Sequence, residues 1–362
     1  MKVIIAGGGT GGHLFPAVAL GEEMIRERPD INVLFVGTSA GLEAKWLPKS
    51  GLSYELFDMH GIRGHSVIER ARASVEFLRA IALARALVKR FRPNLVVSAG
   101  GYASASMGAA ATLSRTPLVL MEQNTRPGLV NRMLSRFAKK ICVGFSDSQA
   151  YFDSSKVEVT GNPTRHQYRP DRSRLEGDPL QILVLGGSSG AHRLNLGVVG
   201  AFKIYGKSVI NLNVVHQTGE ADEDLVRQAY SEMQFKAEVV PFIDDVATAM
   251  HRADLIIARS GAMTVTDIAL AARPAVFVPY PFHKDMQQLH NARVIEKRGG
   301  AIIVRDDDAL APNLARELEA LVKNPSRLIE MGERAHLEAH PDAAQHVARI
   351  CFEVATVENA AA

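Results

Sequence analysis

The chain has 362 residues, of which 47% are hydrophobic and 22% charged, and its formal net charge is +3. This length favours two domains over a single core, and the nearly balanced charge gives no argument for a nucleic-acid partner. Its two cysteines, Cys142 and Cys351, have no zinc-site spacing and predict a reducing compartment without a disulfide framework. The N-terminus lacks a signal-peptide pattern, and no uncharged apolar run is long enough to span a bilayer. Any membrane contact is therefore expected to be peripheral.

The first part of the chain alternates short apolar runs with helical patterns. This alternation is typical of a parallel sheet with helices on both faces. A polar, proline-bearing stretch from Gly161 to about Pro179 then predicts a linker between two domains. The strands predicted before this linker are Val3–Ala6, Asn32–Val36, Leu95–Ser98, Leu118–Leu120 and Lys140–Val143.

The same pattern restarts after the linker. We predict strands at Gln181–Leu185, Asn213–His216, Ala237–Val240, Leu255–Ala258, Ala275–Val278 and Ala301–Val304, and helices at Pro312–Val322, Pro325–Ala339 and Ala343–Ala355. The fold class is therefore α/β, with two doubly wound Rossmann-like domains at 1–162 and 163–340 and a helical tail at 341–362. Ligands of such sheets bind beyond the carboxyl ends of the strands. The first strand of each domain ends in a glycine-rich turn, and the two turns are expected to face one cleft.

The first strand runs into a glycine-rich turn, Gly7-Gly8-Gly9-Thr10-Gly11-Gly12-His13, that opens a helix. Such a turn brings backbone N–H groups close to an anion such as phosphate, although tight strand–helix packing is the alternative. The glycine spacing also fits a nicotinamide dehydrogenase. The second strand, however, ends Val36-Gly37-Thr38-Ser39-Ala40, without the carboxylate that would hold a ribose. His13 titrates near neutrality, so it is a candidate general base, with a helix-capping role as the alternative.

Two further polar groups follow strands of the first domain. Gly100-Gly101-Tyr102-Ala103-Ser104 is either a second helix start or a source of hydroxyls for a polar substrate. Glu122-Gln123-Asn124 follows a buried strand, where unpaired polar groups would be costly. We expect substrate or interdomain hydrogen bonds there, with Glu122 as a candidate to orient His13. A solvated loop is the alternative.

The second domain repeats the motif of a strand, a glycine-rich turn and a helix. It does so at Gly186-Gly187-Ser188-Ser189-Gly190-Ala191 and again from Arg259 to Asp267. Asp267 is a candidate acceptor for ribose hydroxyls, or else a carboxylate that complements the helix dipole. The polar run His283–Gln288 is consistent with sugar recognition, or else with a solvated loop.

An Asp-x-Asp spacing of the kind that some sugar transferases use for a metal occurs in Asp306-Asp307-Asp308. These residues lie just before the helix that Pro312 opens. We favour solvated loop acids near a helix start over a metal site.

The segment from Val67 to Arg92 predicts a basic amphipathic helix. One apolar stripe, with Phe77 and Leu87, is expected to face the core. A second apolar patch is fringed by arginines, which suits an anionic lipid surface, provided that the segment is one helix. A solvated basic face is the alternative. The proposed membrane patch consists of Ile68, Val75, Leu78, Arg72 and Arg79.

The motifs together resemble one known family. In order they are Gly8-Gly9-Thr10-Gly11-Gly12-His13-x-x-Pro16, Gly100-Gly101-Tyr102-x-Ser104, Glu122-Gln123-Asn124, Gly161-Asn162-Pro163, Gly186-Gly187-Ser188-x-Gly190-Ala191 and Arg259–Asp267. From about residue 3 to 345 the chain closely resembles the MurG family of peptidoglycan N-acetylglucosaminyltransferases. The combination is specific to that family, although each glycine loop alone is not.

The resemblance implies a glycosyltransferase of the GT-B type, with no catalytic metal and no cofactor. It implies inverting transfer of N-acetylglucosamine from UDP-N-acetylglucosamine to the 4-hydroxyl of undecaprenyl-pyrophosphoryl-MurNAc-pentapeptide, at the cytoplasmic face of the plasma (inner) membrane. His13 then falls on the proposed base. Donor-contacting positions fall on Thr10, Gly11, Gly12, Asn124, Arg165, Ser188, Ile243, Ala262, Met263, Thr264, Val265, Thr266, Asp267 and Gln288.

The chain departs from the family pattern at two positions. Asp267 stands where the family usually has Glu, so its shorter arm bears on the ribose contact. Met121 stands where the family has His, so a polar role toward the acceptor is not expected there. Two alternatives remain open, namely a related UDP-sugar-dependent lipid glycosyltransferase with another acceptor, and a noncatalytic nucleotide-sugar binding protein.

Overall fold

The structure is a computed structural model of the chain. It describes residues 1–58, 67–165, 167–168, 179–187, 190–205, 211–233, 235–283 and 285–360, and within these ranges it leaves out the side chains of 67–74 and 358–360. The chain divides into two compact units. The first comprises Met1–Arg165 and Asp342–Ala362, and the second comprises His166–Pro341.

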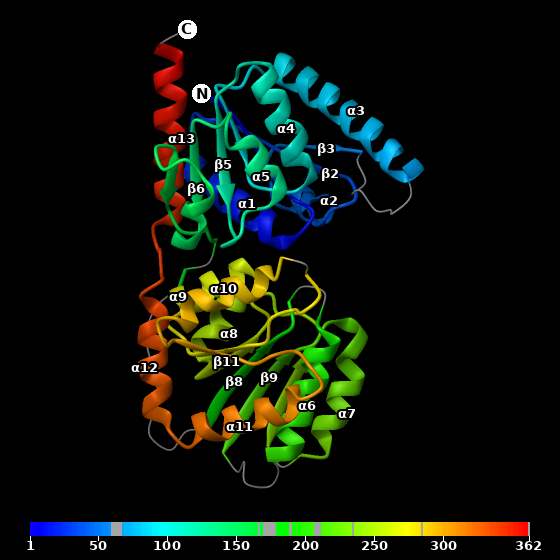
Figure 1. The fold of residues 1–362 in the computed structure, drawn as a ribbon, viewed down its shortest axis with the longest axis vertical. Coiled ribbons are helices and arrows are strands. Elements are labelled where there is room, and N and C mark those ends of the chain that lie inside the picture. The colour runs from blue at the N-terminus through cyan, green and yellow to red at the C-terminus, as the bar shows by residue number, and fades with distance from the viewer. Residues whose placement is uncertain are drawn as a thin grey trace. The chain divides into compact units, whose positions relative to one another are not determined.

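The first unit is built on a parallel sheet with the strand order β3-β2-β1-β4-β5-β6-β7 (Figure 1). Its strands are β1 (Lys2–Ala6), β2 (Asn32–Thr38), β3 (Tyr54–Phe57), β4 (Leu95–Ser98), β5 (Leu118–Glu122), β6 (Lys140–Val143) and β7 (Val157–Val159). Its α-helices are α1 (Gly11–Glu27), α2 (Leu42–Trp46), α3 (Val67–Phe91), α4 (Tyr102–Leu113), α5 (Leu129–Leu134) and α13 (Ala343–Ala360), and its 3₁₀ helices are Leu47–Lys49 and Ser146–Tyr151.

The sheet of this unit is buried on both faces, as its near-continuous apolar central strands require. Helices α1 and α13 supply the core on one face, and α3, α4 and α5 supply it on the other. The C-terminal helix therefore belongs to the first unit, where Val347 and Phe352 pack against the sheet. Cys142 and Cys351 are buried in this layer as free thiols.

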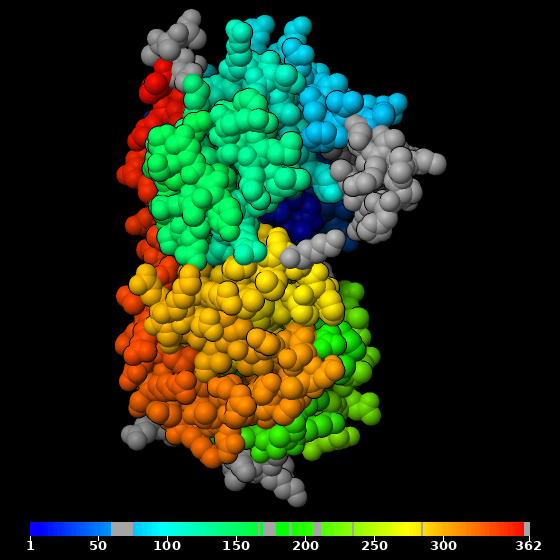
Figure 2. Space-filling view, viewed as in Figure 1, coloured from blue at the N-terminus to red at the C-terminus, as the bar shows by residue number. Residues whose placement is uncertain are grey.

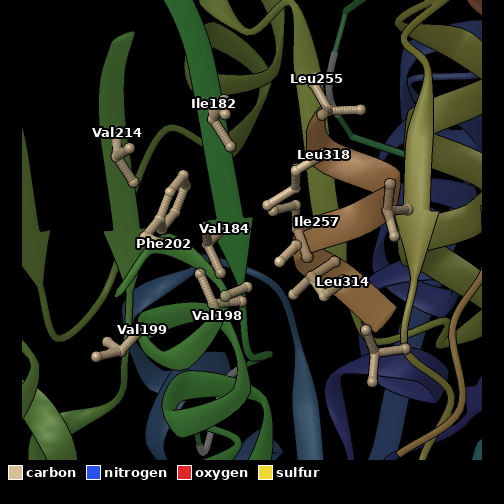
Figure 3. Packing of buried hydrophobic residues seen from close by; sticks show 14 of the residues in the cluster. Ile182, Val184, Val198, Val199, Phe202, Val214, Leu255, Ile257, Leu314 and Leu318 are labelled. Carbon is tan, nitrogen blue, oxygen red and sulfur yellow. The ribbon is translucent and has the colours of Figure 1, made fainter. Parts of the chain in front are cut away.

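The second unit has a six-stranded parallel sheet with the order β10-β9-β8-β11-β12-β13. Figure 3 shows its core, where Phe202 from α6 and Leu314 from α11 cover strands β8 and β11. The strands are β8 (Leu180–Leu185), β9 (Leu212–Gln217), β10 (Lys236–Val240), β11 (Leu255–Ala258), β12 (Ala275–Phe277) and β13 (Ala301–Ile303). The helices are α6 (His192–Tyr205), the 3₁₀ turn Glu220–Asp222, α7 (Glu223–Ser231), α8 (Val246–Arg252), α9 (Ala262–Leu270), α10 (Gln287–Glu296), α11 (Leu310–Val322) and α12 (Pro325–His336).

The predicted class of two doubly wound α/β domains is confirmed, and every strand predicted from an apolar run is present within one or two residues. Two strands were missed, β3 and β7. Both lie at the edges of the sheet and are only partly buried, so their residues alternate with polar ones and form no apolar run. In the part of the chain that the structure describes, no helix has the length and apolar character needed to cross a bilayer.

Candidate active site

Two glycine turns of the first unit close on one another at the carboxyl ends of β1 and β4. Gly9 has φ +86° and Gly100 has φ +97°, which only glycine adopts easily. A Cβ at Gly100 would lie 2.5 Å from His13 Cδ2, and one at Gly101 would lie 2.4 Å from the carbonyl oxygen of Gly8. The absence of side chains at these positions therefore lets the second turn pack directly against the first, with the His13 ring at the junction.

The environment of His13 favours the neutral imidazole. Its Nδ1 lies 3.3 Å from the Thr10 hydroxyl, and its backbone N–H donates to the carbonyl of Thr10. Burial lowers the pKa of His13, while a hydrogen bond to the Gly8 backbone and the charge of Glu43 act in the opposite direction. A histidine that is neutral at neutral pH has a lone pair free to accept a proton, as a general base requires.

Glu43 is a site residue that the sequence analysis missed. Its fully buried carboxylate accepts hydrogen bonds from Gly9 N (2.7 Å), Thr38 N (2.8 Å) and Thr38 Oγ1 (2.8 Å). A buried carboxylate with several donors is tightly fixed, so Glu43 fixes the glycine turn to the end of β2. It also places a negative charge near His13.

A sequence signal for Glu43 existed. The dinucleotide fingerprint expects an acid directly at the end of the second strand, and none is there. The carboxylate instead reaches back from α2, and a Cβ at Gly8, Gly37 or Gly41 would lie within 2.6 Å of one of its atoms. Glycines on both sides of a lone glutamate thus mark the space that this side chain fills.

Glu122 is the last residue of β5 and organises the loop that follows it. Its carboxylate accepts from the backbone N–H groups of Asn124 (3.0 Å) and Gly128 (3.0 Å) and from the Asn131 side chain (2.9 Å). Burial nevertheless raises its pKa, and these hydrogen bonds oppose the rise. Glu122 therefore holds Asn124 in place through hydrogen bonds. The hydrogen bonds of His13, in contrast, run to Thr10 and to the Gly8 backbone.

The remaining predicted residues of the first unit lie in different settings. Thr10 is exposed, and Gly11 and Gly12 form the first turn of α1. Ser104 is buried and donates to the carbonyls of Ala6 and Gly100, so its hydroxyl serves the helix start and not a substrate. Arg165 is bound to Glu22 at 2.9 Å and stacks 4.7 Å from the Trp46 ring.

In the second unit, the predicted donor positions follow the carboxyl ends of β8, β10, β11 and β12. Ser188 lies outside the described residues. Ile243 is half-buried in the loop after β10, and Gln288 accepts a hydrogen bond from Tyr280 N (2.9 Å) while its own carbonyl accepts from the Ser260 hydroxyl. Gln288 thus joins the turn before α9 to the segment before α10.

Helix α9 carries the run from Ala262 to Asp267. Ala262, Val265 and Thr266 are buried, whereas Met263 and Thr264 are partly exposed. Burial and the negative charge of Asp267 raise the pKa of the Tyr168 hydroxyl. This tyrosine therefore stays protonated near the Asp267 carboxylate.

The expectation of solvated acids was wrong for Asp306. Its buried carboxylate accepts from Arg193 Nε (2.6 Å) and Arg259 Nη2 (2.8 Å), and Arg259 also donates to the carbonyl of Val278 (2.9 Å). Asp307 instead accepts from Ala309 N near the start of α11, and Asp308 is fully exposed. Asp306 therefore joins β11, α6 and the end of β13 around the turn that begins α9.

Substituting Asp306→Asn is expected to lower the free energy of unfolding by about 2 kcal/mol, because two guanidinium groups lose their shared anion. Chemical denaturation monitored by circular dichroism measures this change. The matched substitution Asp308→Asn, at a fully exposed carboxylate two residues away, should change stability by less than about 0.5 kcal/mol. Equal effects of the two substitutions would contradict a special role for Asp306.

Helix α3 is a single helix of 25 residues, as the membrane-patch prediction requires. Leu87 and Val88 are buried in the core, whereas Val75 and Leu78 are 50% and 65% exposed, and Arg79 is exposed beside them. The side chains of Ile68 and Arg72 lie outside the described residues. Exposed apolar residues flanked by a cation thus occur on the face where the patch was predicted.

Comparisons with known proteins identify the class. Residues 3–143 match the family model described as "Glycosyltransferase family 28 N-terminal domain". Residues 181–347 match the model described as "Glycosyltransferase family 28 C-terminal domain". The chain belongs to glycosyltransferase family 28.

Individual relatives show which members of this family the chain resembles. The chain is 42% identical, over 96% of its length and 97% of the relative's, to the UDP-N-acetylglucosamine–N-acetylmuramyl-(pentapeptide) pyrophosphoryl-undecaprenol N-acetylglucosamine transferase of Geobacter sulfurreducens. It is 36% identical to the enzyme of the same name from Myxococcus xanthus, over 98% of this chain and 93% of the relative. The crystal structure of Acinetobacter baumannii MurG superposes with a TM-score of 0.81 at 32% identity, covering 97% of this chain and 99% of that one.

Proposed function

We propose that this protein transfers N-acetylglucosamine from UDP-N-acetylglucosamine to the 4-hydroxyl of undecaprenyl-pyrophosphoryl-MurNAc-pentapeptide, a step of peptidoglycan synthesis. The observation that carries the proposal is the 42% identity over nearly the full length of both chains to a transferase with that name. The neutral His13 between two glycine turns supports it, because this is the group that such a transfer needs.

In the proposed step, His13 takes the proton of the acceptor hydroxyl as the oxygen attacks the anomeric carbon of the donor sugar. A new C–O bond forms on the face opposite the departing diphosphate. The bond between that carbon and the diphosphate oxygen breaks, and UDP leaves with the bonding electron pair. The anomeric centre is inverted, and no metal or redox cofactor enters the balance.

The departing diphosphate acquires negative charge, which preorganised donors stabilise. In this proposal the turn that contains Ser188 and the first turn of α9 supply N–H groups. Asp267, which is buried on α9, accepts from a ribose hydroxyl. Gln288, Ile243 and Asn124 contact the rest of the donor.

A transfer assay tests the function. Labelled UDP-N-acetylglucosamine is incubated with a lipid-linked muramoyl-pentapeptide and with a diacylglycerol acceptor, in EDTA, with UDP-glucose and UDP-N-acetylgalactosamine as competing donors. We expect transfer to the muramoyl acceptor only, with little competition. Transfer to diacylglycerol would indicate the related lipid glycosyltransferase, and UDP-sugar binding without transfer to either acceptor would indicate a noncatalytic binding protein.

We also propose that the exposed face of α3 contacts an anionic membrane at the cytoplasmic side, where a lipid-linked acceptor would be met. Val75 and Leu78 would enter the interface, and Arg79 would lie at the headgroups. The proposal is supported by apolar side chains that are half or more exposed on a helix with many arginines.

The double substitution Val75→Asp, Leu78→Asp is expected to lower partitioning onto vesicles that contain phosphatidylglycerol by about 10-fold or more, because two exposed apolar groups that would enter the membrane interface become two charges repelled by the anionic lipid. Vesicle sedimentation measures the bound fraction. Leu337→Asp, at a residue 69% exposed after α12, is the matched control and should bind as the wild type does. Unchanged binding of the double variant would remove α3 from the contact surface.

A further inference from the structure

An apolar groove lies between α3, α4 and α5 of the first unit, in addition to the site described above. Figure 1 shows α4 between the other two helices, and Figure 2 shows the surfaces of α3 and α4 meeting. The groove has a volume of about 500 Å³, which is in the range of small-molecule sites. Its lining includes Phe77 from α3, Leu113 from α4, Leu129 and Met133 from α5, and Phe137 just after α5.

The lining is apolar and largely open to solvent. Leu113, Leu129 and Met133 are 58%, 71% and 56% exposed, which is costly for large apolar side chains gathered at one place. Arg136 stacks 5.0 Å from the ring of Phe137 at the rim. Such a surface fits a hydrocarbon ligand.

The groove begins beside the glycine turns. Helix α4 starts at Tyr102, directly after Gly101, whose Cα packs against Gly8 in the loop that leads to His13. From there the groove follows one face of α4, from Tyr102 through Ala105 and Ala109 to Leu113. At 1.5 Å per residue this path is roughly 16 Å long.

We propose that this groove binds the first isoprene units of the acceptor's polyprenyl chain. The inference rests on the proposed function. In the acceptor, the reactive sugar is followed by a diphosphate and then by the hydrocarbon chain. Along α4 the same order holds, with His13 near the start of the helix, the N–H groups of its first turn next, and the apolar groove beyond them.

The groove fixes the position of the acceptor more than it raises affinity within a bilayer. Lipid tails are about as apolar as the groove, so moving the chain from membrane to protein has little driving force. Holding the chain does restrict the sugar to the vicinity of His13, which favours reaction. For short-chain acceptors dissolved in water, however, burial of the chain adds to binding directly.

The test uses muramoyl-pentapeptide diphosphate acceptors with one, two and four isoprene units, below their micellar concentrations and without detergent. For the wild type, we expect the acceptor KM to fall at least 10-fold from one unit to two. Ala109→Phe fills the groove and should abolish this dependence, leaving the donor KM unchanged. Ala320→Phe, at an exposed alanine of α11, is the matched control and should retain it.

Replacing two exposed apolar residues by serine, Leu129→Ser and Met133→Ser, provides a second test that leaves the buried core untouched. Both should weaken the chain-length dependence. A wild-type KM independent of chain length overturns the inference, as does an equal effect of Ala109→Phe on all three acceptors. If Leu129→Ser and Met133→Ser lose binding to vesicles but keep the wild-type dependence of the acceptor KM on chain length, the inference is also overturned. The groove is then a bilayer contact. Absence of transfer to every acceptor is the distinct result that overturns the proposed function itself.

Discussion

Replacing His13 by alanine is expected to lower kcat by 10²-fold or more, the usual contribution of a positioned general base. The imidazole is the titratable group at the junction of the two glycine turns, and its surroundings keep it neutral. The variant should bind UDP with wild-type affinity in calorimetry, since the donor positions of the second unit are untouched. Transfer that survives in the variant would remove His13 from the role of base.

The pH profile of the wild type provides an independent check. Burial lowers the pKa of His13 below its ordinary value, so the neutral form persists through the neutral range. We therefore expect kcat/KM to be level near pH 7 and to fall only as the pH drops through that lowered pKa. A limb that falls above pH 7 would assign the proton transfer to another group.

The sequence predicted the sheets well because the central strands of a parallel sheet are buried on both faces. Runs such as Leu95–Ser98 are apolar throughout and cannot be confused with a surface helix. Edge strands lack that signal, so Tyr54–Phe57 was missed. The tail helix was predicted, but its packing against the first unit depends on contacts distant in sequence, such as those of Phe352 with the core beside β1.

The site was predictable where a residue type and a turn coincide, as at His13. It was not predictable where a carboxylate pairs with residues that are distant in the sequence. Asp306 has the sequence context of a loop acid, and only the fold brings it between Arg193 and Arg259. Glu43 lies five residues after the end of β2, where the dinucleotide fingerprint would place a carboxylate, and its partners come from two other segments of the chain.

Replacing Glu43 by alanine is expected to lower the free energy of unfolding by about 3–5 kcal/mol. The change leaves the buried N–H groups of Gly9 and Thr38 without their acceptor and opens a cavity beside three glycines. Denaturant titration measures the loss. Glu55→Ala removes a partly exposed carboxylate that pairs with Arg90 on the same unit, and it should cost no more than about 1 kcal/mol.

Glu43→Gln separates the structural role of this residue from its electrostatic effect on His13. The amide keeps the shape of the side chain but presents an NH₂ group to one of the donors, so we expect kcat to fall about 10-fold or more as the glycine turn shifts. The Glu43 charge raises the pKa of His13, so its removal lowers that pKa further. The acid limb of kcat/KM should therefore move to lower pH in the variant, and Glu55→Gln should leave it in place. A purely structural role for Glu43 would reduce activity at every pH without moving the limb, whereas a shift in this direction links the carboxylate to the base that it faces.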